Sequence, residues 1–310
     1  MEGWRSGLTR TLGERVSPKG EHGFESHSFR QYLISSNFYI MSTLPGFEAY
    51  YDMWVRRMSL EEHNLVSRAM HYGYNPDPNV KLSSEAAKLT TNVLIAEQLD
   101  LPVDEPVKIA DLGCGVGGTA LHLNQLFPKS SIYTVNIHTP QLTLLRTFPN
   151  FPVKQIFTLN GDFSKLPIAL NSLDGAYAID SSCYAMDKAE FYTEVMSRLI
   201  PGRKFVIFDV FNKRPPENQL EELLLKYSLT GWMVPSWHNP NGDNIFNTYT
   251  FFDITNNVMP DLIRSYNGAK DKITQNPDSI MIGHLQAIIA LYHCIDLGLL
   301  QYGLLVATKF

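Results

Sequence analysis

A glycine-rich turn directly follows an apolar stretch in VKIADLGCGVGG, residues 107–118. Glycines let the backbone bend sharply and approach a ligand with no Cβ between them. The helix that such a turn opens offers free N–H groups to a carboxylate or a phosphate. The pattern predicts a cofactor site built from Asp111, Gly113, Gly115, Gly117 and Gly118. Because Gly113-x-Gly115-x-x-Gly118 also satisfies the dinucleotide fingerprint, the glycines alone do not choose the cofactor.

Polar residues after the next two strands bear on that choice. A dinucleotide site favours an acidic residue after the second strand, to hold the ribose. This strand ends instead at Asn136, with Gln141 soon after, and both amides can also hydrogen-bond ribose hydroxyls. The third strand runs into Asp162 and Phe163, a carboxylate that could accept from the adenine amine beside a ring that could pack on the base. The alternative role of Asp162 is a helix N-cap.

Asp180 and Tyr184 follow the fourth predicted strand. They lie at the carboxyl edge of the sheet, where open α/β folds bind their ligands. This position predicts a role in chemistry for Asp180 and in the substrate pocket for Tyr184. The alternatives are an N-cap for Asp180 and packing beneath the next helix for Tyr184.

Strands and helices must alternate to position these residues. Apolar runs predict strands at residues 107–112, 131–137, 153–159, 173–179, 204–211, 248–254 and 301–308. Helical periodicity predicts helices at residues 119–127, 141–147, 188–199 and 279–297. The alternation is typical of a mostly parallel sheet wound on both faces.

The N-terminal third is different. Residues 1–40 show no sustained periodicity, so we expect them to contribute nothing to folding or activity, with Met41 as the real start; the alternative is a disordered tail or a targeting arm. From residue 46 to about residue 100 the pattern is helical, interrupted by a proline turn at residues 75–78. The first helix carries Tyr50, Met53, Trp54, Met58, Leu65, Val66 and Met70, and the second, from about Ser84, carries Ala87, Leu94, Ile95 and Leu99. We expect a helical cap over residues 41–105 before a main domain over residues 106–310.

Composition excludes several classes of protein. A content of 44% hydrophobic and 18% charged residues is ordinary for a soluble globular enzyme and excludes wholesale disorder, and a net charge of −5 gives no footprint for nucleic acid. Its three cysteines lack paired spacing, so we expect no disulfide and no metal site. No apolar run reaches the roughly 18 residues of a membrane helix, and the first residues lack a signal peptide. We therefore expect a cytoplasmic protein with no integral membrane segment, and a homo-oligomer is compatible with the sequence.

Four segments, in this order and spacing, resemble the sterol and terpene C-methyltransferases: DLGCGVGG, NGDF, LDGAYAIDSSCYA and RLIPGRKFVIFDV. Within them the chain is most similar to the geranyl diphosphate 2-C-methyltransferase group. MHYGY at residues 70–74, TVNIHTPQ at residues 134–141 and the C-terminal LQYGLLVATKF agree with this resemblance, which covers about residues 48–310.

The resemblance implies a fold, a cofactor and roles for residues. The fold is a class I methyltransferase, an α/β Rossmann-like domain with a seven-stranded, mostly parallel sheet, helices on both faces and an N-terminal helical cap. The cofactor is S-adenosylmethionine, held by Asp111, Gly113, Gly115, Gly117, Asn136, Gln141, Asp162 and Phe163. His71, Tyr72 and Tyr74 of the cap contact a small lipophilic substrate.

An alkene that attacks the cofactor's methyl group is left with a carbocation. Aromatic rings would stabilise it, each contact contributing roughly 0.5–2 kcal/mol, and Tyr72, Tyr74, Tyr184 and Trp232 are the candidates. Asp180 would stabilise the cation and then remove a proton, with Tyr184 beside it. Asp180 stands where the family usually carries glutamate, and residues 231–244 have no clear counterpart; both departures bear on the substrate.

The substrate and the reaction leave alternatives. Arg56, Arg57 and Arg68 could clamp a diphosphate, which would bring Mg²⁺ with it, but solvated helix faces are the simpler reading of these arginines and a sterol-like neutral lipid fits as well. Competing functions are an O- or N-methyltransferase for a small natural product, an NAD-dependent dehydrogenase, and a catalytically silent scaffold.

Overall fold

The computed structural model describes residues 46–60, 68–239, 249–276 and 281–310. The predicted extension, residues 1–40, and Leu65 and Val66 of the first predicted helix lie outside the described residues. Residues Phe47–Phe310 form one compact unit. The boundary expected between residues 105 and 106 stays a prediction.

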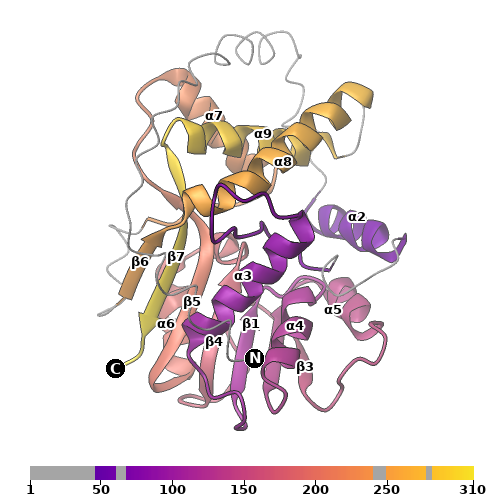
Figure 1. The fold of residues 1–310 in the computed structure, drawn as a ribbon, viewed down its shortest axis with the longest axis vertical. Helices are drawn as coiled ribbons and strands as arrows, with labels where there is room; N and C mark the ends of the chain where they lie inside the picture. Colours follow the sequence, from indigo (N-terminus) through magenta and orange to yellow (C-terminus); the bar gives the residue numbers. More distant parts are fainter. Residues whose placement is uncertain (1–45, 61–67, 240–248, 277–280) are drawn as a thin grey trace. The chain divides into compact units, whose positions relative to one another are not determined.

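Seven strands form one sheet in the order β3-β2-β1-β4-β5-β7-β6 (Figure 1). Every pairing from β3 through β5 is parallel, whereas β7 runs antiparallel to both β5 and β6. The strands are β1 (Lys108–Leu112), β2 (Ser131–Asn136), β3 (Ile156–Asn160), β4 (Leu173–Ile179), β5 (Leu199–Asn212), β6 (Tyr249–Asp253) and β7 (Leu300–Thr308). The predicted mostly parallel, seven-stranded α/β fold is confirmed.

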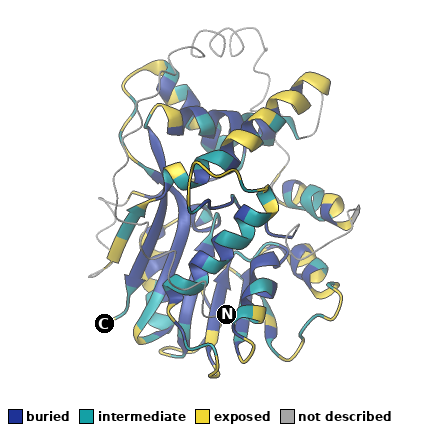
Figure 2. Ribbon diagram, in the orientation of Figure 1, coloured by how far each residue is buried: buried dark blue, intermediate teal, exposed yellow. Residues whose placement is uncertain are grey.

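Alternate residues of the central strands face different helices. Ala110 and Ala176 belong to a buried cluster with Phe191 of α6 (Lys188–Arg198). Gly175, one residue earlier on β4, faces the other way: a Cβ there would lie 2.9 Å from Leu99 at the end of α3 (Ser84–Leu99). Helices therefore cover both faces, and most residues of the central strands are buried (Figure 2).

The remaining helices complete the two layers and extend beyond the sheet. Those after β1 and β2 are α4 (Gly118–Leu126) and α5 (Thr139–Arg146), and a short 3-10 turn, η1 (Ser182–Tyr184), follows β4. The C-terminal helices α7 (Gln219–Thr230), α8 (Thr255–Gln275) and α9 (Ile282–Asp296) gather at one end of the sheet (Figure 1). The sequence predicted α9 but neither α7 nor α8.

The first predicted helix is shorter than expected. It is α2 (Phe47–Leu60), and Met70 lies in a non-helical segment. The next backbone N–H groups form tertiary hydrogen bonds instead: Tyr72 donates to Asp180 and Gly73 to Asp261. These bonds to carboxylates outweigh the apolar periodicity, so the helix prediction was wrong at Met70. In contrast, Ala87, Leu94, Ile95 and Leu99 are buried on α3, as predicted.

No helix among the described residues combines the length and the apolar character needed to cross a membrane.

Candidate functional site

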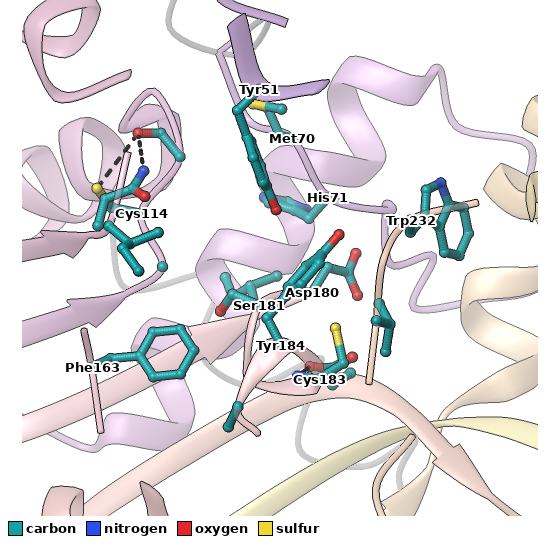
Figure 3. A pocket seen from close by; sticks show the side chains of 18 of the residues that line it. Tyr51, Met70, His71, Cys114, Phe163, Asp180, Ser181, Cys183, Tyr184 and Trp232 are labelled. Carbon is teal, nitrogen blue, oxygen red and sulfur yellow. Dashed lines mark hydrogen bonds between the residues drawn. The ribbon is translucent and has the colours of Figure 1, made fainter. Parts of the chain in front are cut away.

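A cavity of about 650 Å³ opens at the carboxyl ends of β1, β2 and β4. Residues after these strands line one side of it, and the opposite side is formed by α2, α8, α9 and the segment after α7. Figure 3 shows Cys114 and Phe163 on one side and Trp232 on the other, with Asp180 and Tyr184 between them. We call these the glycine-loop half, after residues 113–118, and the aromatic half, which is lined by Tyr50, Tyr51, Trp54, Trp232, Trp237 and His284.

The glycine loop turns as its sequence predicts, with positive φ at Gly113, Gly115 and Gly117. At Gly113 an added Cβ would lie 2.5 Å from the Ser181 Cβ, so the tight packing requires glycine. At Gly115 an added Cβ would meet only the Met70 sulfur, at 3.4 Å, and would otherwise project into open space. Because Gly115 lines the cavity, a side chain there would occupy ligand space.

Gly117 does not line the cavity, unlike the other predicted cofactor residues. It is the left-handed N-cap of α4, with φ of 82°, and an added Cβ would lie 2.2 Å from Leu145 of α5. The direct cofactor contact expected for Gly117 is therefore not supported. Its glycine serves the turn and the packing between α4 and α5.

Asp111 is the penultimate residue of β1 and lines the cavity. It is 4% exposed, and its Oδ2 has no hydrogen-bond partner among the described residues. Burial raises the pKa of Asp111 from 3.8 to about 7. Tyr177 is paired with Asp111 on β4, and its nearby hydroxyl lowers the pKa of Asp111. The Tyr177 hydroxyl is buried and has no hydrogen-bond partner of normal geometry among the described residues. A buried carboxylate without a partner is suited to a cationic ligand group.

Asn136 and Gln141 both line the cavity, but their amides are partly occupied. Asn136 Nδ2 donates to the Gly115 carbonyl at 3.1 Å and to Gln141 Oε1 at 2.9 Å. These bonds tie the end of β2 to the glycine loop and to α5. The two residues thus hold the loop in shape, and the contacts expected with a ribose stay a prediction.

Asp162 and Phe163 lie beside the loop, after β3. Asp162 Oδ1 accepts from the Ser164 N–H at 2.8 Å and so stabilises a turn. No helix begins there, so the helix N-cap that the sequence left as an alternative is not seen. Oδ2 has no hydrogen bond to a described residue. The Phe163 ring packs on Phe191, with 4.8 Å between ring centroids, so its position is fixed by the core.

Asp180 lies between the two halves and adopts a left-handed backbone, with φ of 46°. Its carboxyl accepts from the Tyr72 N–H at 3.0 Å and from the Tyr302 hydroxyl of β7 at 3.1 Å. Burial, with the nearby charge of Asp209, raises the pKa of Asp180 well above its ordinary value. An aspartate held by two other segments in this backbone conformation is not a simple helix cap.

A buried polar network supports this region from below. Asp209 Oδ2 accepts from the Ser182 hydroxyl at 2.6 Å and from the Cys183 N–H at 2.9 Å, and lies 3.4 Å from His238 Nε2. Burial opposes the charge of Asp209, but hydrogen bonding and the charge of His238 outweigh it and lower the pKa of Asp209. His238 also contacts the Tyr192 hydroxyl. The network fixes η1, which follows Asp180 in the chain.

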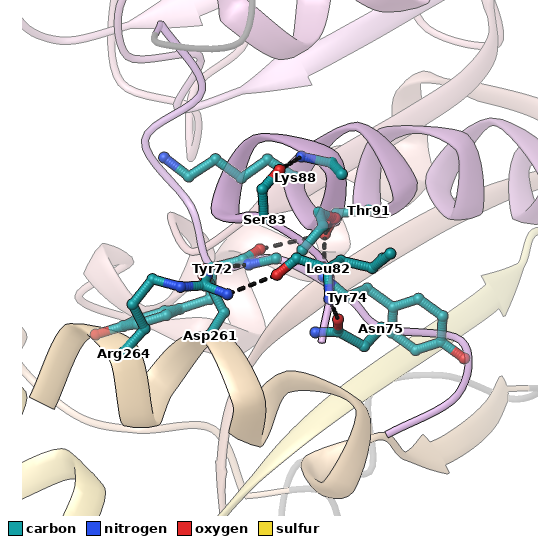
Figure 4. Close-up of polar contacts among 12 residues, drawn as sticks. Tyr72, Tyr74, Asn75, Leu82, Ser83, Lys88, Thr91, Asp261 and Arg264 are labelled. Atoms are coloured by element: carbon teal, nitrogen blue, oxygen red, sulfur yellow. Dashed lines mark hydrogen bonds and ion pairs between the residues drawn. The ribbon is translucent and has the colours of Figure 1, made fainter. Parts of the chain in front are cut away.

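Residues 70–74, which carry the MHYGY motif, lie beside the glycine loop. Met70, His71 and Tyr72 line the cavity, and His71 is buried with its Nδ1 2.8 Å from the Tyr72 carbonyl oxygen. Burial lowers the pKa of His71 to about 4. Tyr74 does not line the cavity, and Figure 4 shows its ring pointing away from that of Tyr72. The substrate contact expected for Tyr74 is therefore not supported; its N–H donates to Thr91, which anchors the segment on α3.

Lining residues that sequence reasoning missed come mostly from the helices around the aromatic half. Tyr51 of α2 lies 6.3 Å from Tyr184, between ring centroids. Asp261 of α8 and Lys88 of α3 also line the cavity, and Lys88 donates to the Ala69 carbonyl at 2.7 Å. The only sequence signal for this wall was the concentration of aromatic residues before residue 75 and after residue 230.

The arginines considered for a diphosphate do not converge on the cavity. Arg56 and Arg57 are exposed on α2, and the Arg57 guanidinium lies over the Trp54 ring. Arg68 lines the cavity, but its Nη1 donates to the Leu144 carbonyl and its guanidinium lies over Phe148. No group of three or more His, Cys, Asp or Glu side chains in the described part of the chain is arranged to hold a metal ion.

Residues 110–207 match the family model of the methyltransferase domain. The chain is 35% identical over 173 residues to methyltransferase phqN of Penicillium fellutanum. The matched region covers 52% of this chain and 51% of that protein. It is 29% identical over 118 residues to cycloartenol-C-24-methyltransferase 1 of Oryza sativa subsp. japonica, covering 36% and 33%. It is 28% identical over 156 residues to O-methyltransferase cnsE of Penicillium expansum, covering 49% and 55%. The chain thus spans between a third and just over half of the length of these relatives.

The fold is similar to that of geranyl diphosphate C-methyltransferase from Streptomyces coelicolor A3(2), solved in complex with Mg²⁺, geranyl diphosphate and S-adenosyl-L-homocysteine. The TM-score is 0.62 at 15% identity, over 84% of this chain and 98% of that chain. At this identity the likeness concerns the fold.

Proposed function

We propose that this chain, which resembles the class I S-adenosylmethionine-dependent methyltransferases and carries their domain over residues 110–207, methylates a carbon atom of a small terpenoid or sterol-like molecule. The observation that carries this proposal is a single cavity that joins the glycine loop to an aromatic half, with the Asp180 carboxyl between them.

The residues of the glycine-loop half fit the cofactor. The open space beside Gly115 admits the methionine part, and the partnerless Asp111 carboxylate would accept its ammonium group. The free Oδ2 of Asp162 would accept from the adenine amine, with the Phe163 ring against the base. When bound, the cofactor supplies an electrophilic methyl group.

The residues between the two halves would stabilise the positive charge that develops on the substrate and remove a proton from it. An alkene that takes a methyl group becomes a carbocation, which the rings of Tyr51, Tyr72 and Tyr184 would stabilise. Ionised Asp180 would stabilise the same charge and accept the proton that leaves the substrate carbon, restoring the double bond. The Tyr72 N–H and the Tyr302 hydroxyl hold the Asp180 carboxyl in place for this role.

The charge of the cavity supports a substrate without a diphosphate. Its described lining carries seven acidic side chains, Asp111, Asp162, Asp180, Asp187, Glu190, Asp209 and Asp261, and three basic ones, Arg68, Lys88 and Lys165. Of the basic groups, Arg68 and Lys88 already bond backbone carbonyls. A polyanion would meet few free basic groups, whereas a neutral lipid would meet aromatic rings. On this proposal the enzyme needs no Mg²⁺ for substrate binding.

A second candidate is O-methylation of a small natural product. It is favoured by the similarity to O-methyltransferase cnsE. Such a reaction needs proximity to the methyl donor but no carboxylate beside a carbocation. The position of Asp180 between the two halves favours the first candidate.

Calorimetry with S-adenosylmethionine and NAD, the two cofactors that fit this glycine-loop fingerprint, tests the cofactor assignment. We expect S-adenosylmethionine to bind with a stoichiometry of one and NAD to give no heat of binding. Binding of NAD in preference to S-adenosylmethionine would overturn the cofactor assignment and revive the dehydrogenase alternative.

A further inference from the structure

The aromatic half contains a histidine whose two ring nitrogens are in different chemical states. His284 Nδ1 lies 2.9 Å from the Tyr50 hydroxyl and accepts from Trp232 Nε1 at 2.8 Å. An indole N–H can only donate, so Nδ1 carries no proton. In a neutral imidazole the proton is then on Nε2. The contact with Trp232 therefore selects the tautomer.

His284 is also kept neutral. Burial, assisted by the positive charges of Arg57 and Lys272, lowers the pKa of His284 to about 3. Protonation of Nδ1 would also break its contact with Trp232. His284 thus presents one N–H donor, at Nε2, with no net charge.

This donor opens to the cavity. His284 is among the lining residues, and its side chain is partly accessible. No described residue hydrogen-bonds Nε2, and Nε2 is not among the fully enclosed polar atoms of the described residues. The rings around it are apolar: Trp54 lies 5.0 Å and Trp232 5.9 Å from the imidazole, between centroids. A single donor in an aromatic wall is costly to leave unpaired once a ligand has displaced the water.

The donor lies away from the cofactor. Trp232, which contacts His284, stands on the side of the cavity opposite Cys114 of the glycine loop (Figure 3). Asp180 and Tyr184 lie between the two sides. A substrate with its reacting carbon near Asp180 would therefore reach His284 with its other end.

We propose that His284 determines specificity by donating its Nε2–H to a neutral oxygen of the substrate, remote from the methylated carbon. The oxygen belongs to a hydroxyl, ether or carbonyl group, because a neutral single donor offers nothing that would compensate a phosphate's charge. This inference rests on the proposed function, since it assumes a small lipophilic substrate in the aromatic half.

Binding to matched probes tests the proposal without turnover. Two pairs of probes differ only in the hydroxyl group: cycloartenol with 3-deoxycycloartenol, and geraniol with the hydrocarbon 2,6-dimethylocta-2,6-diene. Each is titrated into the protein saturated with S-adenosyl-L-homocysteine. In at least one pair the alcohol should bind about 10- to 100-fold more tightly than the deoxy compound, the range expected when a buried donor loses its partner.

Variants separate recognition from packing. His284→Phe keeps a ring but removes both nitrogens, so the alcohol-to-deoxy affinity ratio should fall to about one. Trp232→Phe no longer forces the tautomer and should lower the ratio by a smaller factor. Trp54→Phe is the matched control: it changes the same wall without touching Nε2, so both affinities should shift together and the ratio should persist. An unchanged affinity for S-adenosyl-L-homocysteine shows that each variant is folded.

Equal binding of alcohol and deoxy compound by the wild-type protein, or a ratio that persists in His284→Phe, would overturn the inference while leaving the proposed function intact. If none of the four probes binds to protein that does bind S-adenosyl-L-homocysteine, the lipophilic substrate itself is wrong and the inference falls with it.

Discussion

Asp180 is held by hydrogen bonds from two segments far from it in sequence, and its pKa is raised by burial and by Asp209. A base must be ionised to accept a proton, so turnover should rise with pH through this pKa, at a higher pH than for an exposed aspartate. Asp180→Asn keeps the shape but removes the charge. We expect turnover to fall by roughly 10²–10⁴-fold, the range typical of a lost general base.

The pH profile separates this role from a structural one. Asp180→Asn should lose the acid limb while its affinity for S-adenosylmethionine, measured by calorimetry, stays unchanged. Methylation at close to the wild-type rate by Asp180→Asn, on an identified substrate, would exclude the proton transfer and favour O-methylation.

Asp111 makes a second, independent prediction about pH. Its pKa is 3.8 in an unfolded chain and about 7 in the folded one, so the stability present below pH 3.8 is lost as the pH rises to about 7. Bound cofactor should reverse this trend, because its ammonium group favours the ionised carboxylate. Affinity for S-adenosylmethionine should therefore increase up to about pH 7, and Asp111→Asn should weaken binding and flatten the profile. A profile of affinity against pH that is the same in both proteins would refute the contact.

At the scale of residues, the sequence predicted which side chains lie at the site better than it predicted their contacts. Asp111 lies near the end of a strand, and Gly115, Asp162 and Asp180 follow strands. The ends of parallel strands converge on one edge of the sheet whatever the details of packing. The bonds that Tyr302 and Tyr72 make to Asp180 join segments over 100 residues apart. No local pattern carries such information, and the same holds for the tautomer of His284.

Among the elements, the turn between β1 and α4 contains glycines with two different functions. Gly115→Val should abolish binding of S-adenosylmethionine, because its side chain would project into the cavity, and its left-handed backbone should lower the melting temperature. The loss should be smaller than for Gly117→Val, because only the Met70 sulfur lies near the added Cβ. Gly117→Val should instead destabilise the fold, because it meets Leu145 in a backbone conformation that favours glycine.

Thermal unfolding and calorimetry on both variants measure this contrast. A Gly115→Val protein that is folded and binds the cofactor normally would contradict the placement of the ligand beside the loop.

The elements around the aromatic half were the hardest to predict. α8 runs for 21 residues but contains Pro260, and a proline inside a sequence normally indicates the end of a helix. Conversely, the apolar spacing that reaches Met70 predicts helix where tertiary hydrogen bonds to Asp180 and Asp261 straighten the chain. Strands fared better, because their buried apolar runs between turns are a local signal.

For the molecule as a whole, the alternation of strands and helices was enough to predict a mostly parallel sheet, whereas the antiparallel direction of β7 is known only from the structure. The substrate half of the cavity was not predictable in the same way. It combines α2, α8, α9 and the segment after α7, which meet only in the folded chain. The sequence therefore indicates the cofactor more firmly than the substrate.

The central claim is that this cavity transfers a methyl group to carbon. Incubation of the protein with methyl-labelled S-adenosylmethionine and a panel of sterols, prenyl alcohols, prenyl diphosphates and phenols tests it directly, with mass spectrometry to detect products and NMR to locate the label. The account predicts a product of a neutral sterol or prenyl alcohol that carries the label on a former alkene carbon. Label found only on oxygen or nitrogen, or only in prenyl diphosphate products, would contradict it.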